Sequence, residues 1–287
     1  MKKLFALLFF FSSFLILNAQ DKKLNLIVGT YTKSCDSKGI YVYEFDSKTA
    51  DFKFKNSSEN IINPSYLSVS NDNKFVYSVS ENDNKSSISA FGYNSKSGKL
   101  DFINHQNPNG LNPCYVINDD KNVITANYSS GNISVLGKNI DGSIGEAKQL
   151  VQHTGKSINT NRQEAAHAHM VYFSPDKKYV LANDLGTDKV YVYQYNPNSQ
   201  TEVLKLKSSV NCTPGSGPRH LIFSNDGKYV YVLQELDGVI SSFSYTDGVL
   251  EKRSETSIVS ADFKEDFGAA DIHISPDGKF LYATNRD

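Results

Sequence analysis

Arginine is the scarcest charged residue in this sequence, and its positions point to a binding site. Of the 30 basic residues in a chain of 287, only four are arginines, namely Arg162, Arg219, Arg253 and Arg286. A guanidinium presents a planar fork of donors that lysine cannot copy, and it is difficult to replace where a carboxylate, a phosphate or a polarised carbonyl must be held. The alternative role for these arginines is a structural ion pair.

Histidine could supply acid–base chemistry beside the arginines. Its ordinary pKa lies nearest to neutral pH, so His169 is the expected general base. It belongs to His167-Ala-His169, and two imidazoles at i and i+2 of an extended segment face the same side, where a metal could also use them. No third ligand follows at a metal-binding spacing. We therefore expect a catalytic or substrate-binding histidine and no metal, with a structural histidine as the alternative.

A repeated pattern shows which elements would position these residues. An apolar strand, a turn with aspartate and a strand rich in tyrosine and valine recur five times. The turn aspartates are Asp72, Asp119, Asp176, Asp226 and Asp277, separated by 47, 57, 50 and 51 residues. Each turn predicts a hairpin, and two more alternating strands follow it. Four short antiparallel strands per unit are typical of a β-propeller blade, whereas a β-sandwich does not explain so regular a period.

The repeat predicts an all-β propeller with about five blades in this chain. Residues 24–55 supply about three strands, four full blades follow, and a sixth unit begins near Phe267 and stops at Asp287. A closed ring leaves no strand edge unpaired. We therefore expect the domain to be incomplete, with roughly 70–100 further residues needed to close it, from the length of the repeat.

The repeat also brings distant residues together. Equivalent positions in successive blades are related by rotation about the ring axis, so they lie at the same height around the central channel. Seven residues before each turn aspartate lie Ser65, Asn112, His169, Arg219 and Ala270. Nine residues after it lie Glu81, Tyr128, Leu185, Glu235 and Arg286. Because hairpin strands are antiparallel, both sets lie at the same end of the blade. Four of these residues are predicted to meet at the channel mouth: His169, Arg219, Glu235 and Arg286.

The N-terminus is typical of an export signal. Two lysines precede an apolar run, Leu4–Leu17, and Ala19 offers a small residue for cleavage. We expect residues 1–19 to be a signal peptide, residues 20–287 to be the propeller domain, and the mature protein to be periplasmic or extracellular. The apolar run is too short for a comfortable membrane span, so no stable membrane insertion is expected after cleavage.

Charge and cysteine content exclude other classes of protein. Without the two lysines of the leader, the chain carries 28 basic and 31 acidic residues, which gives no basic footprint for nucleic acid. Three cysteines, Cys35, Cys114 and Cys212, are too few for a disulfide framework. We expect buried free thiols, with a single disulfide as the alternative.

Several motifs resemble one family of propellers. They are Val28–Thr32, Ala126–Gly131, Asn161–Gln163, His167–His169, Asn183–Asp188, Gly217–His220, Gln234–Glu235, Ala270–His273 and Asn285–Arg286. In these motifs the chain resembles the seven-bladed lactonase family, which includes bacterial 6-phosphogluconolactonases and a carboxymuconate-lactonising cyclase. The resemblance covers essentially all of residues 24–287, and it implies seven blades in the intact ring.

The resemblance also implies roles for individual residues. The family's proposed catalytic group is a histidine, two arginines and a glutamate, which match His169, Arg219, Arg286 and Glu235. Weaker candidates for substrate binding, from the same motifs and their histidines, are His167, Asn127, Tyr128, Arg162, Gln163, Asp184, His220 and His273.

The resulting hypothesis is hydrolysis of a sugar-derived lactone, a small-molecule substrate, without a cofactor. Arg219 and Arg286 would bind the carbonyl oxygen or an anionic substituent and stabilise the oxyanion. His169 would be the base and Glu235 would orient an arginine or water, although these two roles are exchangeable. Two alternatives fit the same face: an exported non-catalytic propeller that binds polysaccharide or protein, and a cycloisomerase whose arginines hold the two carboxylates of a muconate-type diacid.

Overall fold

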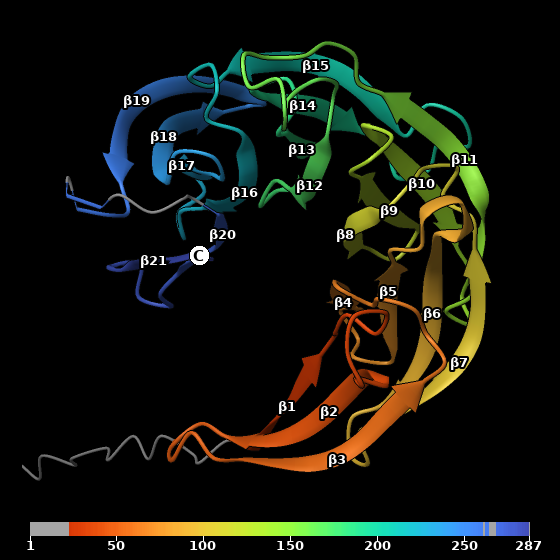
Figure 1. The fold of residues 1–287 in the computed structure, drawn as a ribbon. Helices are drawn as coiled ribbons and strands as arrows, with labels where there is room; N and C mark the ends of the chain where they lie inside the picture. Colours follow the sequence, from red (N-terminus) through yellow and green to blue (C-terminus); the bar gives the residue numbers. More distant parts are fainter. Residues whose placement is uncertain (1–22, 261, 264–267, 287) are drawn as a thin grey trace, which may run out of the picture.

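The computed structural model describes residues 23–260, 262–263 and 268–286. Within these residues, six antiparallel sheets follow one another around a central space (Figure 1). In every sheet the strands pair in sequence order, so each segment of the chain completes one sheet before the next begins. This is the β-propeller architecture that the repeat predicted, and each sheet is a blade or part of one.

The strands match the predicted count in each unit. The first sheet contains β1 (Lys23–Val28), β2 (Gly39–Asp46) and β3 (Phe52–Glu59). The second contains β4 (Leu67–Val69), β5 (Phe75–Ser80), β6 (Ser87–Asn94) and β7 (Lys99–Gln106), with the 3₁₀ helix η1 (Asp83–Lys85) after β5. The third contains β8 (Pro113–Asn118), β9 (Asn122–Asn127), β10 (Asn132–Lys138) and β11 (Ile144–Gln152).

The remaining sheets continue the same order. The fourth contains β12 (Ala168–Phe173), β13 (Tyr179–Asp184), β14 (Lys189–Tyr195) and β15 (Leu204–Asn211). The fifth contains β16 (Pro218–Phe223), β17 (Tyr229–Gln234), β18 (Val239–Thr246) and β19 (Val249–Ser257). The sixth contains β20 (Ala269–Ile274) and β21 (Leu281–Asn285). The predicted start of this unit, Phe267, lies outside the described residues.

The turn aspartates close the inner hairpins. Asp176 Oδ1 accepts hydrogen bonds from Ser174 Oγ at 2.7 Å and from the Lys178 backbone N–H at 3.2 Å. Asp226 and Asp277 repeat this arrangement with their own serine and lysine. The carboxylate thus satisfies a backbone donor that the tight turn leaves unpaired. The recurring motif in the sequence is therefore a turn, as predicted.

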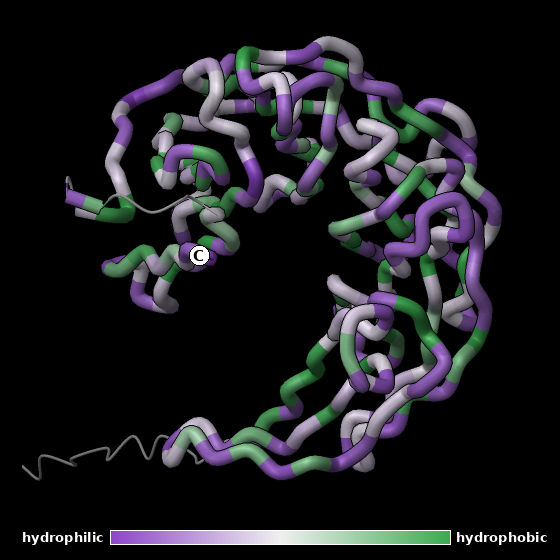
Figure 2. Tube along the Cα trace, in the orientation of Figure 1, coloured by the Kyte–Doolittle hydropathy of each residue, from purple (hydrophilic) through white to green (hydrophobic). Residues whose placement is uncertain are grey.

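The core lies between neighbouring blades. The middle strands β9 and β13 are buried along their whole length, because other blades cover both of their faces. The outer strand β19 is exposed at every residue except Leu250. Figure 2 shows hydrophobic and hydrophilic segments mixed along all the strands, as expected for side chains that alternate between the two faces of a sheet.

Cysteine burial differs from the expectation. All three cysteines are free thiols, as predicted; Cys212 is buried, and Cys114 is only partly buried. Cys35, however, is exposed, because it lies in the connection between β1 and β2 rather than in a strand. The predicted signal peptide lies outside the described residues, and none of the helical structure described is long and apolar enough to cross a membrane.

A buried histidine joins the third blade to the fourth. His153 follows β11, and its Nδ1 donates to Asp184 Oδ2 at 2.8 Å, while its Nε2 lies 2.7 Å from the Tyr193 hydroxyl. The side chain of His153 is 1% exposed and that of Asp184 is fully buried. Asp184 also accepts the backbone N–H groups of His167 and Thr187. This network fixes the junction between the two blades.

Replacement of His153 tests this junction. His153→Phe is expected to lower the free energy of unfolding by about 3 kcal/mol, because it leaves the buried carboxylate of Asp184 without its side-chain partner. Urea denaturation followed by circular dichroism measures the change. The exposed His105 provides the control, since His105→Phe is expected to change stability by less than about 0.5 kcal/mol. Equal stability of the two variants would contradict the assignment.

Candidate active site

Four predicted residues lie at equivalent strand ends. His169 and Arg219 are the second residues of β12 and β16, and Glu235 and Arg286 directly follow β17 and β21. All four line one cavity of about 340 Å³ at the centre of the ring. The other lining residues are Tyr31, Ser65, Tyr66, Glu81, Cys114, Tyr128, Arg162 and His220. The structure thus brings together the residues that rotational equivalence predicted to meet.

A β-bulge directs the first two of these side chains. In the pairing of β12 with β13, Ala168 and Met170 have successive partners and His169 is the extra residue. The pairing of β16 with β17 has the same irregularity at Arg219. A bulge adds one residue to a strand and turns its side chain away from the regular alternation. The bulges therefore turn these side chains out of the regular register of their strands at the edge of the cavity.

Glu235 is the centre of the charged cluster. Its Oε1 lies 2.6 Å from Arg162 Nη2, and its Oε2 lies 2.9 Å from Arg219 Nε. Arg286 Nη2 approaches the same Oε2 at 3.4 Å. The side chain of Glu235 is only 5% exposed, whereas that of Arg286 is 55% exposed. One buried carboxylate therefore holds three guanidinium groups, and the outermost of these faces solvent.

Arg219 is also fixed by its own neighbours. Its Nη1 donates to the carbonyl oxygen of Ala270 and lies 3.3 Å from His220 Nε2. His220 Nδ1 in turn donates to Asp271 Oδ1 at 2.7 Å. Burial disfavours the ionised form of Asp271, but the hydrogen bond to His220, together with the charges of His220 and His273 and the Ile272 backbone N–H, outweighs this effect. The pKa of the carboxyl is therefore well below its ordinary value. The chain from Asp271 to Arg219 thus sets the direction of the guanidinium.

His169 is a buried imidazole beside this cluster. Its Nε2 lies 3.8 Å from Glu235 Oε2, which is too long for a direct hydrogen bond. The Cys114 thiol donates to the His169 carbonyl oxygen at 3.2 Å. Burial, followed by the positive charge of Arg219 and the proximity of His220, lowers the pKa of His169 well below its ordinary value. The imidazole is therefore uncharged at neutral pH and can accept a proton.

A second group of polar residues lines the cavity from the second blade and the β1–β2 connection. The carboxylate of Glu81 accepts hydrogen bonds from the Tyr31 hydroxyl at 3.0 Å and from Ser65 Oγ. Burial raises the pKa of Glu81 and raises that of Tyr31 to about 12. These residues were not predicted as site residues. The signal was present, because Ser65 and Glu81 hold the same repeat positions as Arg219 and Glu235.

Three predicted substrate-binding residues are structural. Gln163 Nε2 donates to the Leu185 carbonyl oxygen, Asn127 Nδ2 donates to Asn132 Oδ1, and Asp184 bonds to His153. All three predicted residues are fully buried and none lines the cavity. Asn127 and Asp184 end strands whose side chains alternate, so they face the junction between blades while the adjacent residue faces the other side. Gln163 lies in the connection between β11 and β12, where its side chain is held by hydrogen bonds to the backbone. The expectation that they line the pocket is corrected accordingly.

The remaining predicted residues support the site or lie outside it. Tyr128 and Arg162 line the cavity and are joined by a hydrogen bond of 3.3 Å. His167 stacks on Tyr128 with ring centroids 4.5 Å apart, and its Nε2 lies 3.2 Å from Glu164. His273 is exposed and pairs with Asp271.

The described residues contain no group of three or more histidine, cysteine or acidic side chains placed to hold a metal. The paired histidines of the sequence motif do not converge, since the ring nitrogens of His167 contact Tyr128 and Glu164 while His169 faces Glu235.

Comparison with known proteins agrees with this architecture. The family model described as "Lactonase, 7-bladed beta-propeller" matches residues 25–287. A 6-phosphogluconolactonase of Bacillus subtilis is 38% identical over 264 residues, which are 90% of this chain and 74% of the relative. A 6-phosphogluconolactonase of Formosa agariphila is 34% identical over 91% of this chain and 75% of its own length.

A solved structure is similar over the same region. The periplasmic gluconolactonase of Pseudomonas aeruginosa superimposes with a TM-score of 0.87 at 34% sequence identity, covering 92% of this chain and 76% of the other. The blade order, the shared strand-end cavity and these matches lead to one conclusion. This chain belongs to the family of seven-bladed β-propeller lactonases.

Proposed function

We propose that this protein hydrolyses the ring ester of a sugar-derived lactone of the gluconolactone type, with 6-phosphogluconolactone as the phosphorylated candidate. The relatives named above are lactonases of these substrates. The observation that carries the proposal is the cluster around Glu235, in which three guanidinium groups lie beside an uncharged, buried imidazole. This combination provides a base and a positive site for an oxyanion within one cavity.

The proposed reaction begins with water held between His169 Nε2 and Glu235 Oε2. The gap of 3.8 Å between these atoms suits groups that share a bridging water rather than a direct bond. The water oxygen attacks the carbonyl carbon of the lactone, and His169 accepts a proton from the water at the same time. The imidazolium then returns the proton to the ring oxygen as the ester C–O bond breaks, which yields the hydroxy acid.

The arginines stabilise the negative charge that develops during attack. Arg219 is held in place by Glu235, His220 and the Ala270 carbonyl, so it needs little reorganisation to bind the oxyanion. Arg286 has the most exposed guanidinium of the cluster and suits an anionic substituent of the substrate, such as a phosphate. The buried carboxylate of Glu235 keeps these cations together, where they would otherwise repel each other.

We also propose that the protein is exported. The proposal rests on the leader-like first 19 residues and on similarity to a periplasmic gluconolactonase. Expression of the full chain with its leader in a Gram-negative host is expected to yield a periplasmic protein that begins at Gln20, because Ala19 is the small residue before the cleavage site. N-terminal sequencing of the periplasmic fraction measures this. A chain that keeps residues 1–19 and stays in the cytoplasm would overturn the proposal.

Substitution within the cluster tests the catalytic assignment. Arg219→Ala and Glu235→Ala are each expected to lower kcat/KM for gluconolactone and 6-phosphogluconolactone by about 10²- to 10³-fold, because the first removes a positioned oxyanion donor and the second removes the carboxylate that positions this donor. Acid release in a pH-stat measures turnover. Arg253→Ala is the matched control, because Arg253 pairs with Glu251 on the exposed surface of β19. Circular dichroism verifies that each variant is folded.

The same assay separates the alternative functions. Unchanged turnover in both cluster variants would remove the assignment of Arg219 and Glu235. Turnover of muconate-type acids alone would indicate a cycloisomerase, and no turnover of either class would indicate a binding propeller.

The pH dependence of the reaction tests the role of His169. Groups around this imidazole are Arg219, Arg286, His220, Glu235 and the Cys114 thiol. Because the pKa of His169 is lowered, its basic form is present at pH 6.5 and above and is lost only as pH falls well below 6.5. After subtraction of spontaneous hydrolysis, kcat/KM is expected to be level from about pH 6.5 to 8. An inflection near pH 7 that His169→Gln abolishes would contradict this prediction.

A further inference from the structure

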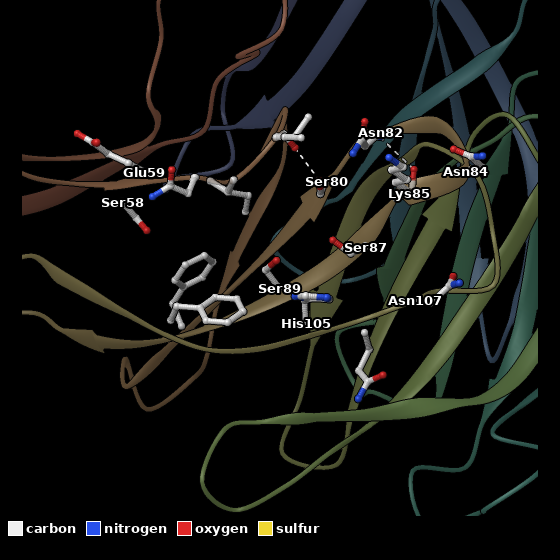
Figure 3. A pocket seen from close by; sticks show the side chains of 17 residues that line it. Ser58, Glu59, Ser80, Asn82, Asn84, Lys85, Ser87, Ser89, His105 and Asn107 are labelled. Atoms are coloured by element: carbon white, nitrogen blue, oxygen red, sulfur yellow. Dashed lines mark hydrogen bonds between the residues drawn. The ribbon is translucent and has the colours of Figure 1, made fainter.

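A second cavity of about 750 Å³ lies on the outer side of the ring, between the first and second blades (Figure 3). The end of β3, the loop after β5 and the strands β6 and β7 line it. None of its lining residues belongs to the central cavity, although the two approach each other at β5: Ser80 lines the outer cavity, and Glu81 lines the central one. The proposed lactonase reaction does not use this space.

The outer cavity is a local departure from the repeat. Ser80, the last residue of β5, pairs with Ser87 of β6. The equivalent pair is Asn127 with Asn132 in the third blade. In the fourth blade it is Asp184 with Lys189. At this pair of positions the third and fourth blades therefore have longer side chains, whereas the second blade has two serines, which leave the space open.

The same departure leaves a hydroxyl without a partner. Ser89 occupies the strand position of Ser134 and Ser241 in the third and fifth blades. Those two serines accept hydrogen bonds from Asn127 Nδ2 at 2.8 Å and from Gln234 Nε2 at 3.1 Å. Ser89 is only 5% exposed, and within the described residues its hydroxyl makes no hydrogen bond. Ser80 is too short to reach it, so the hydroxyl is open only to the cavity.

Aromatic side chains border this hydroxyl. His105 is the cross-strand partner of Ser89, and Figure 3 shows both on the same wall of the cavity. The ring of Phe102 lies 6.0 Å from that of His105 and is 58% exposed. Buried Phe91 contacts Phe102 edge to face, with centroids 5.8 Å apart, and supports it from below. An exposed ring beside unpaired hydroxyl and imidazole groups matches the apolar face and hydroxyl edge of a sugar ring.

The charge of the lining selects among ligands. The cavity contains one acid, Glu59, and one lysine, Lys85, and Glu59 is already paired with Lys38 at 3.1 Å. The central cavity, by contrast, has three arginines. We propose that the outer cavity is a binding site for a neutral saccharide of one or two rings, which stacks on Phe102 and hydrogen-bonds to Ser89 and His105. The proposal is independent of the lactonase activity.

A fluorescent reporter tests this site. The protein contains no tryptophan, so Phe102→Trp introduces a single indole at the cavity. Titration of this variant with glucose, maltose and cellobiose is expected to give a saturable change in emission for at least one sugar, while gluconate gives none. Calorimetric titration of the unmodified protein with the same sugar provides a second measurement that does not depend on the new side chain. Leu206→Trp, at an exposed position of β15, is the matched control and is expected to show no saturable change.

Two further variants connect binding to the departure from the repeat. Ser80→Asn places an asparagine where the third blade has Asn127, the residue that donates to Ser134, the counterpart of Ser89. This change is expected to abolish binding, both in the Phe102→Trp protein and in the protein without the tryptophan. Ser89→Ala removes only the hydroxyl, and it is expected to weaken binding at least fivefold while kcat/KM for lactones stays unchanged. No saturable response to any neutral sugar at tens of millimolar, by either method, would overturn the proposal, as would equal affinity in Ser80→Asn.

Discussion

The contact of one buried carboxylate with three guanidinium groups is the constraint on which the central site depends. Glu235 comes from the fifth blade, Arg162 from the connection between the third and fourth, and Arg286 from the sixth. Like charges at this separation repel one another, and the buried carboxylate offsets this repulsion where the arginines converge. The ring must therefore hold these segments at one height, and the regular blades do so.

The blades position most of the site through strand ends rather than through long loops. His169, Arg219, Glu235 and Arg286 each lie within one residue of a strand terminus, where the antiparallel ladder fixes the backbone, whereas Arg162 comes from the connection between β11 and β12. Bulges at His169 and Arg219 then break the regular alternation at the channel edge. Rigid strands and a local irregularity together give a pre-organised site, which suits electrostatic stabilisation because such catalysis requires little movement of dipoles during reaction.

The repeat made the fold and the main cluster predictable, because rotational symmetry converts a period in sequence into a position in space. Hairpin turns, blade count and the meeting of His169 with Arg219 followed from it. Motif membership was a weaker guide to pocket lining: Asn127, Gln163 and Asp184 lie in matching motifs but face the blade junctions. The alternation of residues along a strand did not indicate which side chains at its end face the channel, because a single bulge reverses the orientation of the side chains beyond it. The exposure of Cys35 follows from the conformation of the β1–β2 connection, which the sequence repeat does not determine.

Neighbouring residues at the end of β5 belong to separate compartments. Ser80 lines the outer cavity, and Glu81 lines the central one. Opposite orientation of successive side chains along an extended chain produces this division. A change of side chain on one wall can therefore leave the other wall intact, and the two chambers of this propeller are free to diversify independently in evolution.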